Sequence, residues 1–200
     1  MIERHRLETD TDDGLLLIIS GPSGVGKTTI TRGVERRTRG SVFSVSATTR
    51  LKTDADVDGV DYHFVTSEAF DQMIEEGDLL EYADVFGKKY GTPKRWVDEQ
   101  LDRGRVVILE IDVKGAIQVK EKRPDAFGIF ILPPSERTLL QRLRDRKREG
   151  EEAIQRRFAE AQREIALARE SSVYDMFIVN DDLERAIEEA RDAVKARRGR

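Results

Sequence analysis

The sequence predicts an α/β fold in which helices cover a mostly parallel β-sheet. Apolar runs at residues 15–19, 106–111 and 127–132 are continuous rather than alternating, which is typical of strands buried on both faces. Helical segments separate most of the predicted strands, and this alternation favours layers of helix and parallel sheet. A chain of 200 residues is expected to form one domain with a sizeable core.

Composition excludes several classes of protein. The absence of cysteine excludes a disulfide scaffold, a Cys-ligated zinc site and a cysteine nucleophile. A net charge of -4 does not favour nucleic-acid binding. The longest apolar run, residues 15–19, is far shorter than the ~20 residues that span a bilayer, and no secretion signal opens the chain. We therefore expect a cytoplasmic protein with neither nucleic acid nor membrane as a partner; its oligomeric state is left open.

The other elements follow from apolar spacing and from turn residues. Residues 1–13 are polar and are expected to form a flexible tail. Pro93 is expected at the first position of a helix with Thr92 as its cap, and a further helix opens at Ser135. The remaining predicted helices lie at residues 27–37, 67–76, 151–170 and 182–198, and the remaining strands at residues 42–45, 61–65, 79–85 and 176–179.

The most informative motif satisfies G-x-x-x-x-G-K-[ST] from Gly21 to Thr28, between a predicted strand and a predicted helix. Its glycines let consecutive N–H groups surround phosphate oxygens, and the helix adds its positive end. Lys27 would reach the β- and γ-phosphates, and the Thr28 hydroxyl would hold Mg²⁺. The sequence therefore predicts an ATP-type triphosphate site made by Gly21, Pro22, Ser23, Gly24, Val25, Gly26, Lys27, Thr28 and Thr29.

Six further blocks follow in order: SVSATTR at residues 44–50, DGVDYHFV at 58–65, EYA at 81–83, YGTP at 90–93, LEIDVKG at 109–115 and IVNDD at 178–182. With the phosphate loop, this series resembles the guanylate kinase family over nearly the whole chain. The resemblance implies transfer of the γ-phosphoryl group of ATP to GMP with Mg²⁺, giving ADP and GDP.

The resemblance also implies a domain organisation. It predicts a P-loop NTPase fold with a parallel-sheet core, a small mixed α/β insert that binds GMP, and a helical lid. Within a single domain at residues 14–200, the core would comprise residues 14–44, 93–137 and 171–200, the insert residues 45–92, and the lid residues 138–170.

Site residues follow from the same resemblance. Guanine presents two donors on one edge, and Glu81 matches the carboxylate that accepts both. Phosphoryl transfer from an anionic donor to an anionic acceptor requires cationic clamping more than a base, and the matching catalytic residues are Lys27, Arg146 and Arg157, with Arg142 a weaker candidate. The GMP-binding residues implied by the resemblance are Ser46, Arg50, Tyr62, Glu81, Tyr90, Thr92 and Asp112.

Glu110 lies two residues before Asp112 at the end of a predicted strand, which places both carboxylates on one face at the carboxyl edge of the sheet. Glu110 is a candidate for orienting a magnesium shell through water.

The chain departs from the family after Arg50. The family usually continues Arg-x-Pro-Arg-x-Gly-Glu, whereas residues 50–56 read RLKTDAD here. Thr53 therefore replaces a second phosphate-binding arginine, and Asp56 replaces the glutamate. We expect a raised KM for GMP, which Lys52 would offset in part.

Two alternatives stay open at this point. One is a related P-loop kinase with another phosphorylated acceptor, such as a ribose bisphosphate, which would not need the guanine carboxylate. The other is a non-catalytic binding module of the guanylate kinase type. Such modules typically lose the chemistry of the phosphate loop, whereas Gly26, Lys27 and Thr28 are present here.

Overall fold

The structure is a computed structural model that describes residues 14–85, 87–145 and 150–199. The tail expected at residues 1–13 lies outside the described residues.

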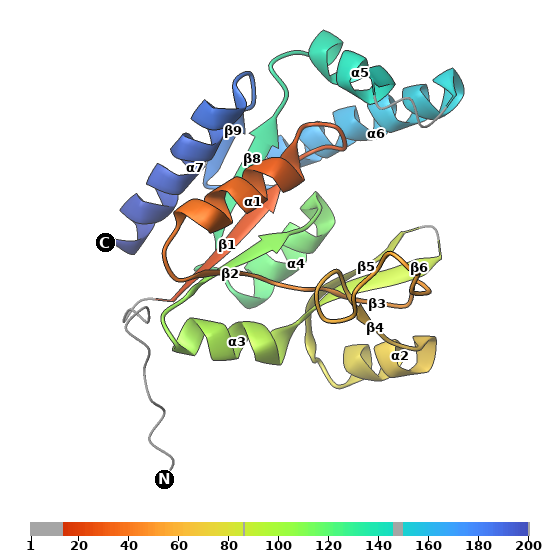
Figure 1. Ribbon diagram of the computed structural model, residues 1–200, viewed down its shortest axis with the longest axis vertical. Coiled ribbons are helices and arrows are strands. Elements are labelled where there is room, and N and C mark those ends of the chain that lie inside the picture. The colour runs from red at the N-terminus through yellow and green to blue at the C-terminus, as the bar shows by residue number, and fades with distance from the viewer. Residues whose placement is uncertain (1–13, 86, 146–149, 200) are drawn as a thin grey trace.

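The central sheet has five strands in the order β2-β7-β1-β8-β9, and every pairing in it is parallel (Figure 1). Its middle strand is fully buried, which explains why an uninterrupted apolar sequence forms it. The observed sheet confirms the predicted α/β fold with a parallel core. Its strands are β1 (Leu15–Ser20), β2 (Ser41–Phe43), β7 (Val106–Glu110), β8 (Phe127–Leu132) and β9 (Met176–Val179).

Helices cover both faces of this sheet. Side chains alternate along β1, so that Leu17 and Ile19 pack toward α1 and α7 while Leu16 and Ile18 pack toward α3 and α4. Each face is sealed by an apolar cluster, which gives a three-layer core. The covering helices are α1 (Lys27–Arg37), α3 (Lys94–Asp102), α4 (Val113–Lys122) and α7 (Leu183–Arg198). Among the described residues, no helix combines the length and the apolar character needed to cross a membrane.

A second, four-stranded sheet in the order β4-β3-β6-β5 forms most of the insert. It has a small apolar cluster of its own around Ala47, Phe70 and Leu79. Figure 1 shows this sheet beside the end of the central sheet rather than as a continuation of it. Its elements are β3 (Ala47–Thr48), β4 (His63–Phe64), α2 (Ser67–Glu75), β5 (Leu79–Val85) and β6 (Lys88–Pro93).

The helix α5 (Glu136–Asp145) and the first half of α6 (Glu151–Glu170) form a third unit, whereas the end of α6 packs through Ala168 into the core cluster on the α3–α4 face of the sheet. They pack on each other through Leu139, Leu143, Ile154 and Ala161. In Figure 1 they lie above the loop between β1 and α1, while the insert lies below it. The phosphate loop is thus placed between two peripheral units, each with its own apolar cluster.

The structure corrects several boundaries, among them those of the strands predicted at 42–45 and 61–65 and of the helix predicted from Pro93, and it adds elements that the sequence did not indicate. Pro93 is the N-cap of α3 rather than its first helical residue, and no side chain caps that helix start. The hydroxyl of Thr92 instead donates a hydrogen bond to Glu81. The strands β3 and β6 and the helix α4 were not predicted, because two of them are short or polar and α4 lies between stronger apolar runs.

We predict that Phe70→Ala destabilises the insert before the core. Phe70 is fully buried in the insert cluster, so the truncation costs about 3–5 kcal/mol of unfolding free energy. Hydrogen exchange should show lost protection in β3, β5 and β6 and retained protection in β1, β7 and β8. Phe177→Ala, at a ring that is 38% exposed, is the milder control. Equal loss of protection in both sheets would contradict a separate insert.

Candidate active site

The phosphate loop runs from the end of β1 to the start of α1. Gly24 and Gly26 have φ angles of 89° and 94°, in the left-handed region that side chains with a Cβ rarely adopt. A Cβ on Gly26 would also lie 2.7 Å from the amide nitrogen of Asn180. These positions therefore require glycine for both conformation and space.

Two polar side chains of α1 lie over this loop. The Nζ of Lys27 donates to the Gly21 carbonyl at 2.7 Å, so its ammonium group stays at the loop. The hydroxyl of Thr28 donates to Glu110 Oε1 at 2.7 Å. Because Glu110 ends β7, the neighbour of β1, the parallel sheet brings its carboxylate to the first turn of α1. This contact was not among the predicted ATP-site contacts, although the strand-end position of Glu110 signalled it.

The rear of the loop is supported by β9 and α5. The amide of Asn180 donates to the Val25 carbonyl at 2.7 Å. The guanidinium of Arg142 donates to the same carbonyl at 3.3 Å and to the Asn180 carbonyl at 3.0 Å. Arg142 therefore holds the loop from outside, and Asn180 is a structural member of the site that the sequence indicated only through its block.

The helix α6 places two charged groups against the loop. Arg157 Nη2 donates to Ser23 Oγ at 2.5 Å. Glu164 lies about two turns further along the same face of α6, and burial raises its pKa to about 6, opposed by the positive charge of Lys27 and the N–H of Ser23. Sequence analysis missed Glu164; its spacing of two turns from Arg157 was the available signal. Arg146 lies outside the described residues.

Glu81 is a buried acidic residue of the insert, on β5. Its side chain is buried, and Oε1 accepts a 2.6 Å hydrogen bond from the Thr92 hydroxyl. Burial raises the pKa of Glu81 to about 7, and nearby Asp112 raises it further, against the lowering effect of the Thr92 bond. A Cβ on Gly115 would lie 2.9 Å from Glu81 Oε2, so the glycine leaves room for the carboxylate.

Asp112 lies near Glu81 across Gly115, and Ser46 lies at a register position next to Thr92. Asp112 is the N-cap of α4, and its Oδ1 accepts the Gly115 N–H at 2.7 Å, so this carboxylate has a structural role in addition to any contact with a ligand. Ser46 lies one residue beyond the Ala47–Gly91 pair of the antiparallel β3–β6 register, opposite Thr92.

A third group gathers near the edge of the insert. The guanidinium carbon of Arg50 lies 5.2 Å from the centre of the Tyr62 ring, and the Tyr62 and Tyr90 rings are 5.7 Å apart. Burial raises the pKa of Tyr62, so its hydroxyl stays protonated and able to donate. The structure thus brings Arg50, Tyr62 and Tyr90 together, as the resemblance implied.

Similarity to known proteins identifies the family of this chain. The family model for guanylate kinase matches residues 14–197. The chain belongs to the guanylate kinase family. A guanylate kinase of Symbiobacterium thermophilum is 48% identical over 94% of this chain and 87% of its own, and one of Carboxydothermus hydrogenoformans is 46% identical over 92% and 88%. The crystal structure of guanylate kinase from Anaplasma phagocytophilum superposes with a TM-score of 0.72 at 30% identity, over 96% of this chain and 90% of that one. This family membership confirms the resemblance, the enzyme class and the P-loop α/β fold.

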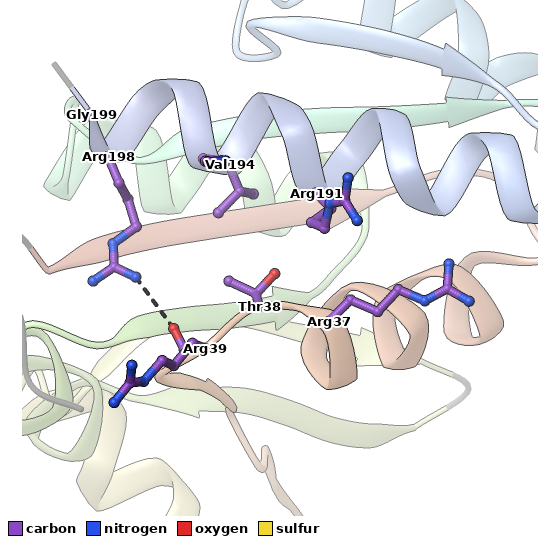
Figure 2. Close-up of a pocket in the computed structure, with 8 residues that line it drawn as sticks. Arg37, Thr38, Arg39, Arg191, Val194, Arg198 and Gly199 are labelled. Atoms are coloured by element: carbon purple, nitrogen blue, oxygen red, sulfur yellow. Dashed lines mark hydrogen bonds between the residues drawn. The ribbon is translucent and has the colours of Figure 1, made fainter. Parts of the chain in front are cut away.

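A separate cavity of about 410 Å³ lies between the ends of α1 and α7, where none of the predicted guanylate kinase site residues is found (Figure 2). Its basic side chains belong largely to the last turns of these two helices, where cations stabilise helix C-termini. Arg37 is paired with Glu184 and Glu188, and Arg198 donates to the Arg39 carbonyl. These residues join α1 to α7 on the side of the core away from the phosphate loop.

The raised pKa of Glu81 predicts a pH-dependent stability. A folded pKa of about 7 against a reference of 4.5 means that the folded state keeps a proton that the unfolded state loses. The stability that Glu81 contributes is full below pH 4.5 and is lost as pH rises through 7. The total change is up to about 3 kcal/mol. Urea titrations should show wild type losing this amount relative to Glu81→Gln across that window, and parallel stability curves would disprove the raised pKa.

Proposed function

We propose that this protein transfers the γ-phosphoryl group of ATP to GMP, with the residues of the phosphate loop holding ATP and those of the insert holding GMP. Membership of the guanylate kinase family supports phosphorylation of GMP to GDP with ATP. The observation that carries the proposal at the level of residues is the buried carboxylate of Glu81 in the insert.

A buried carboxylate suits guanine because the ring N1–H and the 2-amino group are adjacent donors. Glu81 would accept both, and the Thr92 bond at 2.6 Å holds the carboxylate in place. Adenine lacks this pair of donors and would leave the buried acceptor unpaired, which is costly. Ser46 and Asp112 would supply the smaller polar contacts around the base.

The acceptor phosphate would bind to Arg50, Tyr62 and Tyr90. Arginine offers a planar fork for phosphate oxygens, and two tyrosine hydroxyls add neutral donors. For the transfer to take place, the acceptor phosphate held by these three residues would have to face the γ-phosphate at the phosphate loop.

The phosphate loop would hold ATP through the nine predicted residues, with Lys27 on the β- and γ-phosphates. The Thr28 hydroxyl and the Glu110 carboxylate form a hard oxygen pair that fits Mg²⁺, since this ion takes few protein ligands and the rest from phosphates and water. No group of three or more acidic, histidine or cysteine side chains is arranged for a metal in the described part of the chain. Bound Mg²⁺ would neutralise charge on the phosphates.

The chemical step needs positioning more than acid–base catalysis. An ionised phosphate oxygen of GMP attacks the γ-phosphorus, the bond to the β–γ bridging oxygen breaks, and ADP leaves with that electron pair. Lys27, Arg146 and Arg157 would stabilise the charge on the transferred group. We further propose that the insert (45–92) and the lid (138–170) close on the core to exclude water.

Acceptor selectivity tests the proposal directly. A coupled assay of ADP release should give the highest kcat/KM with GMP in a panel with AMP and ribose bisphosphate. Glu81→Gln should lower kcat/KM for GMP by about 10²- to 10⁴-fold, since an amide can accept only one of the two bonds. Glu75→Gln, exposed on α2, is the matched control. Preference for ribose bisphosphate, or equal activity of both variants, would refute the assignment.

The role of the lid arginine is tested by two neighbouring residues. Arg157→Ala should lower kcat by about 10³-fold because a cation is lost at the phosphoryl group. Arg156→Ala is the control, since Arg156 is exposed and pairs with Glu152 at 3.1 Å on the same helix. Steady-state kinetics at saturating ATP and GMP give the comparison. Similar kcat values for the two variants would remove Arg157 from the catalytic residues.

A further inference from the structure

The loop after Arg50 is organised around Asp56. Residues 51–55 and 57–60 are exposed, whereas the side chain of Asp56 retains only 14% of its accessible surface. An acidic side chain turned inward within an exposed loop indicates that other groups hold it there.

Among the described residues, the hydrogen-bond partners of Asp56 are Arg50 and Thr53, both within six residues of it. Oδ1 accepts from Arg50 Nη2 at 2.7 Å, and Oδ2 accepts from Arg50 Nη1 at 3.0 Å. Oδ2 also accepts from the N–H of Thr53 at 2.8 Å and from its hydroxyl at 2.6 Å. Arg50 and Thr53 together hold the pKa of Asp56 well below its usual range, so the group is anionic at physiological pH.

The pairing with Asp56 occupies one hydrogen-bonding edge of the Arg50 guanidinium and leaves a second edge available. Asp56 binds end-on, across Nη1 and Nη2, and the second N–H of Nη1 is directed at the Leu51 carbonyl at 3.1 Å. The remaining edge consists of the Nε–H and one N–H of Nη2, and among the described residues neither has a hydrogen-bond partner. That edge is a second planar fork of the kind that binds phosphate with two bonds.

Aromatic rings restrict the guanidinium from the sides. Its carbon lies 5.2 Å from the centre of the Tyr62 ring and 5.3 Å from that of Phe64. Together with the end-on carboxylate, these contacts fix the plane and the rotation of the Arg50 fork.

We propose that Asp56, held by Thr53, is a positioning residue that orients Arg50 so that its Nε–Nη2 edge takes the phosphate of the acceptor nucleotide. This inference rests on the proposed function, because it assumes that Arg50 meets the GMP phosphate. It also gives Thr53 a role of its own. Thr53 replaces the family's second arginine, and its hydroxyl stabilises the carboxylate that aligns the one arginine left in the loop. Lys52 is exposed, and within the described part of the chain it forms no hydrogen bond or ion pair with this group.

If Asp56 acted only through its charge, its removal would have the opposite effect on the affinity for GMP. Asp56 neutralises much of the charge of Arg50, so if charge alone decided binding, its removal would tighten the complex with GMP. If orientation decides, removal weakens it, because the long arginine side chain then has to lose rotamer freedom on binding.

The test compares GMP with guanosine, which has the same base and no phosphate. Titration calorimetry on the full chain should show Asp56→Asn raising the Kd for GMP about tenfold and leaving the Kd for guanosine unchanged. Steady-state kinetics should show the same rise in KM for GMP with kcat and the KM for ATP nearly unaltered.

Thr53→Val, which removes only the hydroxyl, should raise the Kd for GMP about threefold. Asp56→Glu introduces the acid that the family usually has at this position. It should bind GMP more tightly than Asp56→Asn does and less tightly than wild type.

The controls distinguish a failure of the positioning role of Asp56 from a failure of the proposed function. Asp54→Asn, an exposed acid in the same loop, should leave both Kd values unchanged. Tighter GMP binding by Asp56→Asn, no change, or equal weakening of GMP and guanosine would overturn the positioning role. If wild type itself phosphorylated AMP or ribose bisphosphate in preference to GMP, the proposed function would fail instead.

Discussion

The position of β1 in the middle of a parallel sheet is the constraint on which the rest of the site depends. A strand buried on both faces cannot shift without exposing its apolar side chains, so its carboxyl end is a fixed point in the molecule. The loop that follows can then keep glycines in left-handed conformations that a mobile segment would not hold. The neighbouring strand β7 adds Glu110 to the same edge, and β9, on the far side of β8, is followed there by Asn180, because parallel strands end together.

The insert, by contrast, keeps a carboxylate away from water. Burial opposes ionisation of Glu81, and one hydroxyl bond from Thr92 compensates only in part, so its pKa stays raised. A site of this kind is costly without a ligand and favours a partner that supplies two donors at once. At the other edge of the insert the acid is well compensated, because Asp56 forms short hydrogen bonds with the guanidinium of Arg50. The insert therefore holds an acid with few partners at Glu81 and a guanidinium whose orientation Asp56 restricts at Arg50.

Several local features could be predicted from the sequence because their physical cause is local. The helix at residues 151–170, the strand at 127–132 and the helix after the phosphate loop all have the expected bounds, because each is encoded by neighbouring residues and their end signals. The short strands β3 and β6 could not be found in this way. Their residues are largely polar, and their pairing partners are distant in the chain. The capping role expected for Thr92 was wrong for a related reason, since a buried carboxylate eleven residues away takes its hydroxyl.

The amino-acid sequence by itself determined the phosphate loop, the alternation of strands and helices, and the identity of the family, since these depend on residue types at fixed short spacing. Only the tertiary structure decided what individual polar side chains contact. It placed Thr53 on Asp56, Arg142 behind the loop, and Glu164 near Lys27. Contacts of this kind depend on how the loop folds and on which elements pack together, and the spacing of residues along a chain carries little information about either.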